Sequence, residues 1–218
     1  MKTPERPFQF FTASYLVRIR DQKATSSAEL GECLANSSDA SVFYHTFQTL
    51  SRHHFLTEGF SNDFAQWVLA ACNRPELAEQ LASLDIRDYL SLAELRTDLH
   101  RIVTTYCATY PAQANQEAFE PFFFCDAIEV AVPLGVEVKT LEEFRRSVEQ
   151  LSHASFYYHF VASRLRLHLR TNDFSHWLLN SLGLEALAQR VNRIDIYTNT
   201  VESARAEISA LIEKEMAQ

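Results

Sequence analysis

The stretch SFYYHFVASRLRLHLRTNDFSHW, residues 155–177, determines how the rest of the chain is interpreted. Its residues 164–170 alternate basic and apolar side chains, and this two-residue period is typical of a half-buried β-strand with a cationic face. A related stretch, SVFYHTFQTLSRHHFLTEGFSNDFAQW at residues 41–67, lacks the alternation. Because related segments are expected to share a backbone state, and because both carry residues at helical spacing, the comparison favours a helix in both places.

The two stretches are part of a longer self-similarity that predicts a tandem duplication. His45 and His159 lie 114 residues apart, whereas Trp67 and Trp177 lie 110 apart, so a single four-residue deletion aligns the copies. We therefore expect two repeats that are related by a pseudo-twofold axis and packed as one compact unit. The expected bounds are 1–110 for the first repeat, 111–120 for the connector and 121–218 for the second repeat.

Each repeat is predicted to contain one strand followed by about five helices, so the fold class is mainly α with a small β component (α+β). Alternation marks the strands within 11–19 and 128–132, and we expect these strands to pair with each other because unpaired backbone groups are costly to bury. The expected helices are 27–36, 41–55, 63–72, 76–83 and 91–107 in the first repeat, and 141–151, 155–169, 173–182, 184–191 and 200–215 in the second.

Two helix starts carry the same polar signal. Ser26 with Glu29, and Thr140 with Glu143, each have the spacing of a capping box, in which a hydroxyl and a carboxylate satisfy backbone amides at a helix N-terminus. The shared signal predicts that both repeats begin their first helix at the same place.

The charge and glycine content exclude several classes of function. A net charge of −8 and a pI near 5.5 argue against a general nucleic-acid surface or an anionic membrane surface, because both need clustered Lys and Arg. Only four glycines are present, too few and too scattered for glycine-rich phosphate loops or a G-x-S-x-G nucleophile elbow.

The spacing of the cysteines and the length of the hydrophobic runs indicate the cellular compartment. Four isolated cysteines with no C-x-x-C pair fit a reducing cytoplasm and indicate neither a zinc knuckle nor a redox motif. The sequence shows no apolar run of signal-peptide or membrane-spanning length. We expect a soluble cytoplasmic protein.

One polar pattern occurs in both repeats and forms the candidate site. At about 100° per residue, steps of four and seven return to the same helix face, so each repeat places an imidazole, a hydroxyl and a guanidinium in one stripe. Such a stripe could hold a small anion, with the arginine giving bidentate contacts. An Asn-Asp pair follows each stripe at the next helix start. The candidate ligand-binding residues are His45, Thr49, Arg52, Asn62, Asp63, His159, Ser163, Arg166, Asn172 and Asp173.

Structural interpretations of these residues stay open beside the functional one. A polar stripe on an amphipathic helix is commonly solvated or internally hydrogen-bonded. Asn62 or Asp63 can serve as a helix N-cap, and Asp63 with Gln66 has capping-box spacing, which leaves the other residue of the Asn-Asp pair to bond His45 or Arg52. Phe64, Trp67, Phe174 and Trp177 are interpreted as core residues.

No metal site, cofactor or catalytic residue is assigned. The sequence contains no H-E-x-x-H or E-x-x-H pair, and neither a thiol nor a serine stands out as a nucleophile.

The repeated combination of a Tyr-His helix and an Asn-Asp-Phe-x-x-Trp helix resembles an uncharacterised bacterial family described only as a domain of unknown function. YYHFVASRLRLHLRTNDFSHW is its most specific part, and the resemblance covers most of the chain. It implies a bacterial setting but no activity. We favour a non-enzymatic binding or regulatory module with a small anionic ligand. The alternatives are an enzyme using His and Asp as acid and base, or a scaffold for protein partners.

Overall fold

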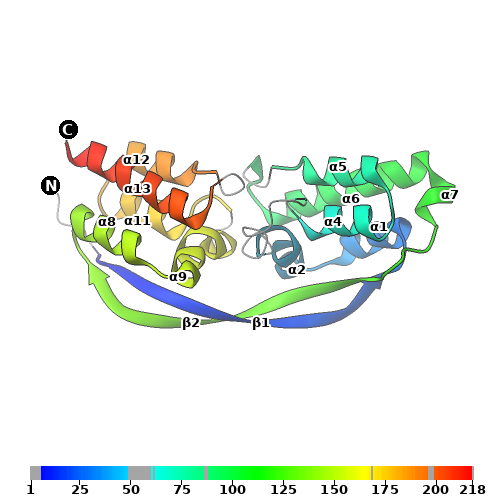
Figure 1. The fold of residues 1–218 in the computed structure, drawn as a ribbon, viewed down its shortest axis with the longest axis horizontal. Coiled ribbons are helices and arrows are strands. Elements are labelled where there is room, and N and C mark those ends of the chain that lie inside the picture. The colour runs from blue at the N-terminus through cyan, green and yellow to red at the C-terminus, as the bar shows by residue number, and fades with distance from the viewer. Residues whose placement is uncertain are drawn as a thin grey trace. The chain divides into compact units, whose positions relative to one another are not determined.

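The computed structural model describes residues 6–48, 60, 62–85, 88–167, 169–195 and 199–217, without the side chains of Gln48, Leu165 and Arg166. Helices dominate, and the two strands β1 (Phe8–Ala24) and β2 (Phe122–Val138) form a two-stranded sheet (Figure 1). The predicted α+β class, mainly α with a small β component, is therefore confirmed, as is the pairing of the two strands.

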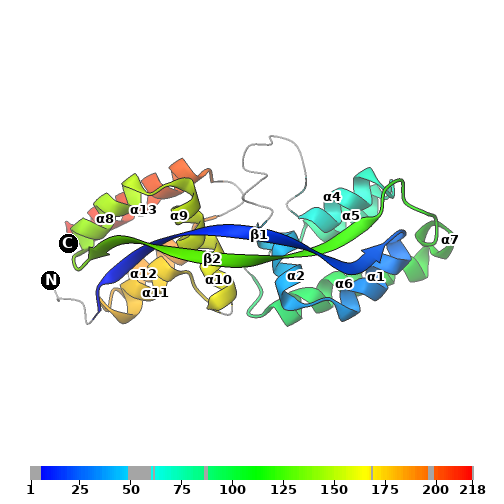
Figure 2. The ribbon, with the colours of Figure 1, turned by 90° about the horizontal axis from the view of Figure 1, so that it is seen from below.

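The two strands run antiparallel and lie side by side (Figure 2). Their cross-strand contacts show the direction, since the β2 partner number falls as the β1 number rises. The Gln9 amide donates to Glu137, the Tyr15 hydroxyl donates to Glu129, and the Arg18 guanidinium donates to Asp126. Both strands begin before the predicted alternation. Each opens with two buried phenylalanines on either side of one exposed residue, Phe8 and Phe10 in β1 and Phe122 and Phe124 in β2.

The contacts divide the chain into two compact units whose border crosses both strands. Unit 2 is Leu16–Ile128, and unit 1 combines Met1–Tyr15 with Glu129–Gln218. The beginning of β1 therefore belongs to unit 1, and the beginning of β2 belongs to unit 2. The predicted repeats 1–110 and 121–218 follow a different division of the chain, and they stay a prediction.

Unit 2 is built around helices that pack in pairs, α1 against α6 and α4 against α5. In chain order its helices are α1 (Ser27–Asn36), α2 (Asp39–Phe43), the π-helix η1 (Tyr44–Gln48), α4 (Asp63–Ala70), α5 (Pro75–Ala82), α6 (Leu92–Thr109) and the short α7 (Pro111–Ala114).

Unit 1 has a corresponding series, in which α8 packs against α13 and α11 against α12. Its helices are α8 (Leu141–Gln150), α9 (His153–Tyr157), the π-helix η3 (Tyr158–Ala162), α10 (Ser163–Arg166), α11 (Asp173–Asn180), α12 (Glu185–Asn192) and α13 (Val201–Met216).

The residues that follow Arg166 along the quoted stretch end the helix. Ser163–Arg166 is helical, so the helical interpretation of the cationic stretch is confirmed over those residues, and the backbone then turns at Leu169, which has φ 62°. The predicted helices 41–55 and 155–169 were wrong in two respects. A π-helix follows the α-helix in each, and the second helical stretch ends at Arg166. The part of the first prediction beyond Gln48, and His168, lie outside the described residues.

Caps confirm the helix starts that the sequence indicated. The hydroxyls of Ser26 and Thr140 accept from the backbone amides of Glu29 and Glu143. Only Thr140 completes the reciprocal box, because the Glu29 carboxylate instead accepts from the backbone amide and the hydroxyl of Thr25. Local side chains therefore determine where α1 and α8 begin.

The ends of α4 and α11 share a left-handed residue, which closes each helix. Asn73 has φ 54° and Gly183 has φ 70°. The amides of Asn73 and Arg74 bond the carbonyls of Leu69 and Val68, and the corresponding pattern follows α11. The bond from each left-handed residue to the carbonyl four residues earlier is that of an αL C-cap, which satisfies one of the last carbonyls of the helix.

The strand starts bring phenylalanines into the helical core. Within unit 1 the ring of Phe8 lies 5.3 Å from Phe144 and 5.7 Å from Trp177, measured between centroids. Within unit 2 the ring of Phe122 lies 5.3 Å from Phe64 and 5.6 Å from Trp67. The prediction that Phe64, Trp67, Phe174 and Trp177 are core residues is confirmed, because all four are buried.

Candidate functional site

Both ring nitrogens of His45 in unit 2 form hydrogen bonds within the protein. His45 lies on η1 and only 3% of it is exposed. Its Nδ1 lies 2.8 Å from Oδ2 of Asp63 at the start of α4. Its Nε2 lies 2.8 Å from the backbone N of Cys125 on β2 and accepts that N–H. An Nε2 that accepts carries no proton, so the ring is neutral and its Nδ1–H donates to Asp63.

Unit 1 contains the same arrangement. His159 on η3 is 2% exposed, its Nδ1 lies 2.8 Å from Oδ2 of Asp173, and its Nε2 accepts from the backbone N–H of Phe11 at 2.8 Å. In both units, therefore, a carboxylate orients an imidazole that binds the backbone of a β-strand. The polar residues that the sequence singled out form a strand anchor.

The Asn-Asp pairs divide their two roles as the sequence analysis proposed. Asn62 and Asn172 are the N-caps, since their side-chain oxygens accept from the amides of Ala65 and Ser175 at 2.9 Å. The adjacent aspartates bond the histidines. The suggested Asp63–Gln66 capping box is wrong, because Asn62 occupies the cap and the Gln66 side-chain oxygen accepts from the amide of residue 60.

The rest of each predicted stripe is only partly described. The Ser163 hydroxyl is buried; it donates to the carbonyl of His159 and accepts from the amide of Asp173 at 3.2 Å. Thr49, Arg52 and the side chain of Arg166 lie outside the described residues. The described members of the stripes thus form internal hydrogen bonds, and an anion held by the stripes stays a prediction.

Two tryptophans extend the strand anchors, a role that the sequence analysis missed. The indole N–H of Trp67 donates to the carbonyl of Glu120 at 2.8 Å, and that of Trp177 donates to the carbonyl of Arg6 at 2.9 Å. Both rings are buried, and a buried indole N–H needs an acceptor. The sequence could therefore have indicated that each indole needs an acceptor, but not which carbonyl provides it.

A buried carboxylate on β2 was also missed. Asp126 accepts two hydrogen bonds from Arg18, at 2.9 and 2.8 Å, and Arg20 lies 3.4 Å away. The hydrogen bonds from Arg18 hold the pKa of Asp126 below its usual range, against the opposing effect of burial. The pair joins β1 to β2 within unit 2.

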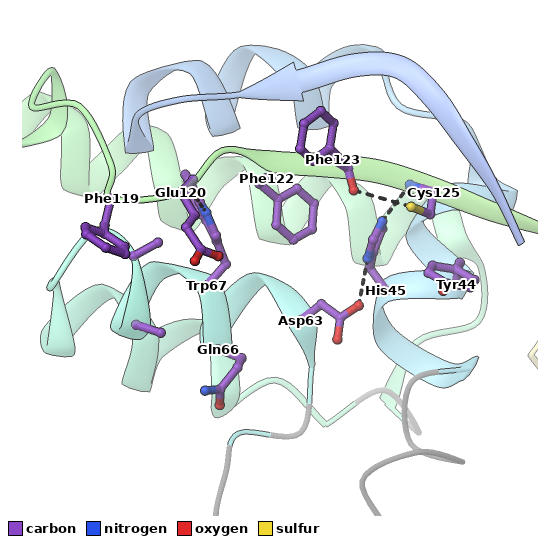
Figure 3. Close-up of a pocket in the computed structure, with 12 residues that line it drawn as sticks. Tyr44, His45, Asp63, Gln66, Trp67, Phe119, Glu120, Phe122, Phe123 and Cys125 are labelled. Atoms are coloured by element: carbon purple, nitrogen blue, oxygen red, sulfur yellow. Dashed lines mark hydrogen bonds and ion pairs between the residues drawn. The ribbon is translucent and has the colours of Figure 1, made fainter.

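A cavity of about 610 Å³ opens beside the His45–Asp63 pair (Figure 3). Helix α4 contributes one wall, and the chain entering β2 contributes the opposite wall. The lining residues are Tyr44, His45, Asp63, Gln66, Trp67, Ala70, Ala71, Phe119, Glu120, Phe122, Phe123 and Cys125. Of the residues that the sequence analysis nominated, His45 and Asp63 therefore border this cavity.

The described residues give little evidence for a reactive cysteine or for a metal site. Burial raises the pKa of the thiols of Cys33, Cys72 and Cys107, which disfavours the reactive thiolate. Across residues 6–217, outside the gaps given above, no group of three or more His, Cys, Asp or Glu side chains gathers as a metal site. Over the same residues, no helix is both long and apolar enough to span a bilayer.

Comparisons place the chain among relatives without an assigned activity. A solved structure titled "The structure of OrfY from Thermoproteus tenax" is 27% identical, with a TM-score of 0.85, and the match covers 100% of this chain and 99% of that chain. No curated protein matches the sequence. The family of unknown function DUF5752 matches residues 5–213. Because that match spans almost all of the sequence, the chain belongs to the family of unknown function DUF5752.

Proposed function

We propose that this protein is a non-enzymatic binding module whose ligand site is the unit 2 cavity beside His45 and Asp63. The observation behind the proposal is that both ring nitrogens of His45 are hydrogen-bonded within the protein, beside a cavity of about 610 Å³. The volume lies within the range of small-molecule pockets, roughly 300–1,000 Å³.

The hydrogen bonds of His45 argue against acid–base catalysis. A general base needs a lone pair within reach of a substrate proton. The Nε2 lone pair of His45 faces the amide of Cys125 instead, and the Nδ1 proton faces Asp63. Both ring nitrogens of His159 form the equivalent hydrogen bonds. The His-Asp pairs therefore support a structural role, and the cavity supports binding.

Small-molecule screening by thermal shift and calorimetry tests this function on the full chain. Gln66 lines the cavity from α4, so Gln66→Arg is expected to abolish binding by filling it. The matched control is His176→Arg on α11, because His176 stands three residues after Asp173 as Gln66 stands three after Asp63. A bound compound should be recovered chemically unchanged. Conversion of that compound, or binding unaffected by Gln66→Arg, would overturn the proposal.

We also propose that the two helical series descend from one duplicated unit. The paired imidazole, carboxylate and indole contacts of the two units support this origin. A bacterial, cytoplasmic setting stays a prediction.

A protein-interaction role is the second candidate. The observation that favours it is a row of exposed apolar side chains on alternate residues of β2 in unit 1, namely Val130, Val132, Leu134 and Val136. Strands in a two-stranded sheet keep an open edge, so a second copy of this chain is the partner to test. Sedimentation should then show a dimer that Val132→Lys dissociates, and a concentration-independent monomer would exclude it.

A further inference from the structure

We infer that the unit 2 cavity selects a small organic cation, such as an alkylammonium or guanidinium compound. The inference rests on the proposed binding function and names its ligand class. It differs from the anion that the sequence pattern suggested, and it is carried by the side chains of the cavity wall.

The charge of the wall is the first reason. Asp63 and Glu120 are carboxylates, and the described lining residues include no Lys or Arg. His45 adds no positive charge, because its Nε2 accepts the Cys125 amide. The Asp63 side chain is 26% exposed, and Glu120 is exposed. A partly enclosed wall of one charge sign attracts ligands of the opposite sign.

The aromatic content of the wall is the second reason. Phe119, which lines the cavity, is 87% exposed, and the buried rings of Trp67 and Phe122 line it as well. The faces of such rings attract cations, and aromatic cages are a common solution for quaternary ammonium groups. A bare metal ion fits less well, because it requires several converging oxygen or nitrogen ligands. Rings and carboxylates together match an organic cation.

The wall is also held in place before any ligand arrives. The amide of Phe119 bonds the carbonyl of Ala71 at 2.8 Å, and the carbonyl of Glu120 accepts from Trp67 at 2.8 Å. The amide of Cys125 is bonded to His45. Three backbone anchors over residues 119–125 thus fix the segment, which reduces the entropy lost on binding.

A comparison with unit 1 distinguishes the residues that anchor the strand from those that would contact a ligand. Trp177 bonds the carbonyl of Arg6 as Trp67 bonds that of Glu120, and His159 bonds the amide of Phe11 as His45 bonds that of Cys125. By this correspondence, unit 1 has Arg6 where unit 2 has Glu120.

Unit 1 therefore keeps the anchor but lacks the carboxylate of Glu120. The carboxylate at this position is therefore not required by the strand anchor.

Calorimetry and thermal shift with choline, 1,4-diaminobutane and guanidinium chloride test the inference on the full chain. The neutral choline isostere 3,3-dimethylbutan-1-ol and inorganic phosphate are the comparison probes. We expect at least one cation to bind, with about tenfold or greater preference for choline over its isostere if choline is that cation. Affinity should fall as ionic strength rises.

Wall variants locate the binding. Phe119→Ala and Glu120→Gln replace exposed side chains and should each weaken cation binding about threefold or more. Two unit 1 variants, Gln9→Ala and Arg6→Gln, should leave binding unchanged, and Arg6 is the position that corresponds to Glu120. Cation binding that is insensitive to Phe119→Ala and Glu120→Gln would overturn the inference.

The comparison probes distinguish the two proposals. If 3,3-dimethylbutan-1-ol or phosphate binds in a manner that Gln66→Arg abolishes, while all three cations fail, the cation inference is wrong and the binding function stands. If no compound in this panel or in the wider screen binds, both proposals fail.

Discussion

The Nε2 atom of His45 accepts the backbone N–H of Cys125 across 2.8 Å, and thereby joins a π-helix to a β-strand 80 residues later in the chain. The carboxylate of Asp63 holds the other side of the ring. The imidazole is 3% exposed, so both hydrogen bonds are shielded from water on the imidazole side. Their loss would leave a partly buried amide and a partly buried carboxylate without this partner, which is costly.

His45→Ala is therefore expected to destabilise the protein by about 3 kcal/mol, and His159→Ala by a similar amount, through the unsatisfied partners and the space left behind. Urea unfolding at neutral pH measures the effect. His176→Ala is the control, because that histidine is exposed on α11 and should change the midpoint little. A loss below about 0.5 kcal/mol for both buried histidines would contradict the anchoring role.

Trp67→Phe isolates the indole hydrogen bond, since phenylalanine keeps most of the buried ring but cannot donate to Glu120. We expect a loss of about 1–2 kcal/mol, measured by thermal unfolding. Trp177→Phe should behave alike, because its indole bonds Arg6. Unchanged melting temperatures in both variants would show that the carbonyls find other partners at no cost.

Asp126 should make stability depend on pH below its ordinary pKa of 3.8. Its pKa is lowered in the folded state by Arg18, so the stabilisation is present above the unfolded-state pKa and is lost as pH falls through the folded-state pKa. Arg18→Gln should therefore reduce stability at pH 7 and flatten the acid dependence. Arg20→Gln is the matched control with a smaller effect, because Arg20 lies 3.4 Å from the carboxylate. Equal acid profiles in the wild type and the Arg18 variant would refute this assignment.

Gly183→Ala should cost about 1 kcal/mol, because Gly183 has φ 70° and a Cβ there meets no atom within 4 Å. Backbone strain is then the whole effect. Gly183→Asn should cost less, since Asn73 adopts the same conformation at the end of α4. Thermal unfolding of both variants measures the difference. If alanine and asparagine are tolerated equally, the left-handed backbone is not what limits this position.

Local signals predicted most of the helices. The hydroxyls of Ser26 and Thr140 and the asparagines at 62 and 172 act on amides three residues away, so they are legible in a linear sequence. The π-helices at Tyr44–Gln48 and Tyr158–Ala162 were not predicted, because their apolar spacing resembles that of an ordinary α-helix.

The sequence predicted part of the arrangement of the candidate site. A contact of the Asn-Asp pair with His45 was one of the alternatives, and His45 and Asp63 do meet, whereas Thr49 and Arg52 lie outside the described residues. The cavity wall at Phe119 and Glu120 falls within the predicted connector 111–120, where no motif marks a binding residue.

The amino-acid sequence alone determined the α+β class, the helix starts and the matched polar residues, because these depend on neighbours within a few positions along the chain. Only the tertiary structure decided which strand each histidine binds, and that the unit 2 cavity has acidic and aromatic walls. Those features depend on contacts between residues up to 171 positions apart, such as Trp177 and Arg6. Buried donors and acceptors need hydrogen-bond partners, and these partners can lie far apart along the chain. No local sequence pattern therefore shows which partners will meet.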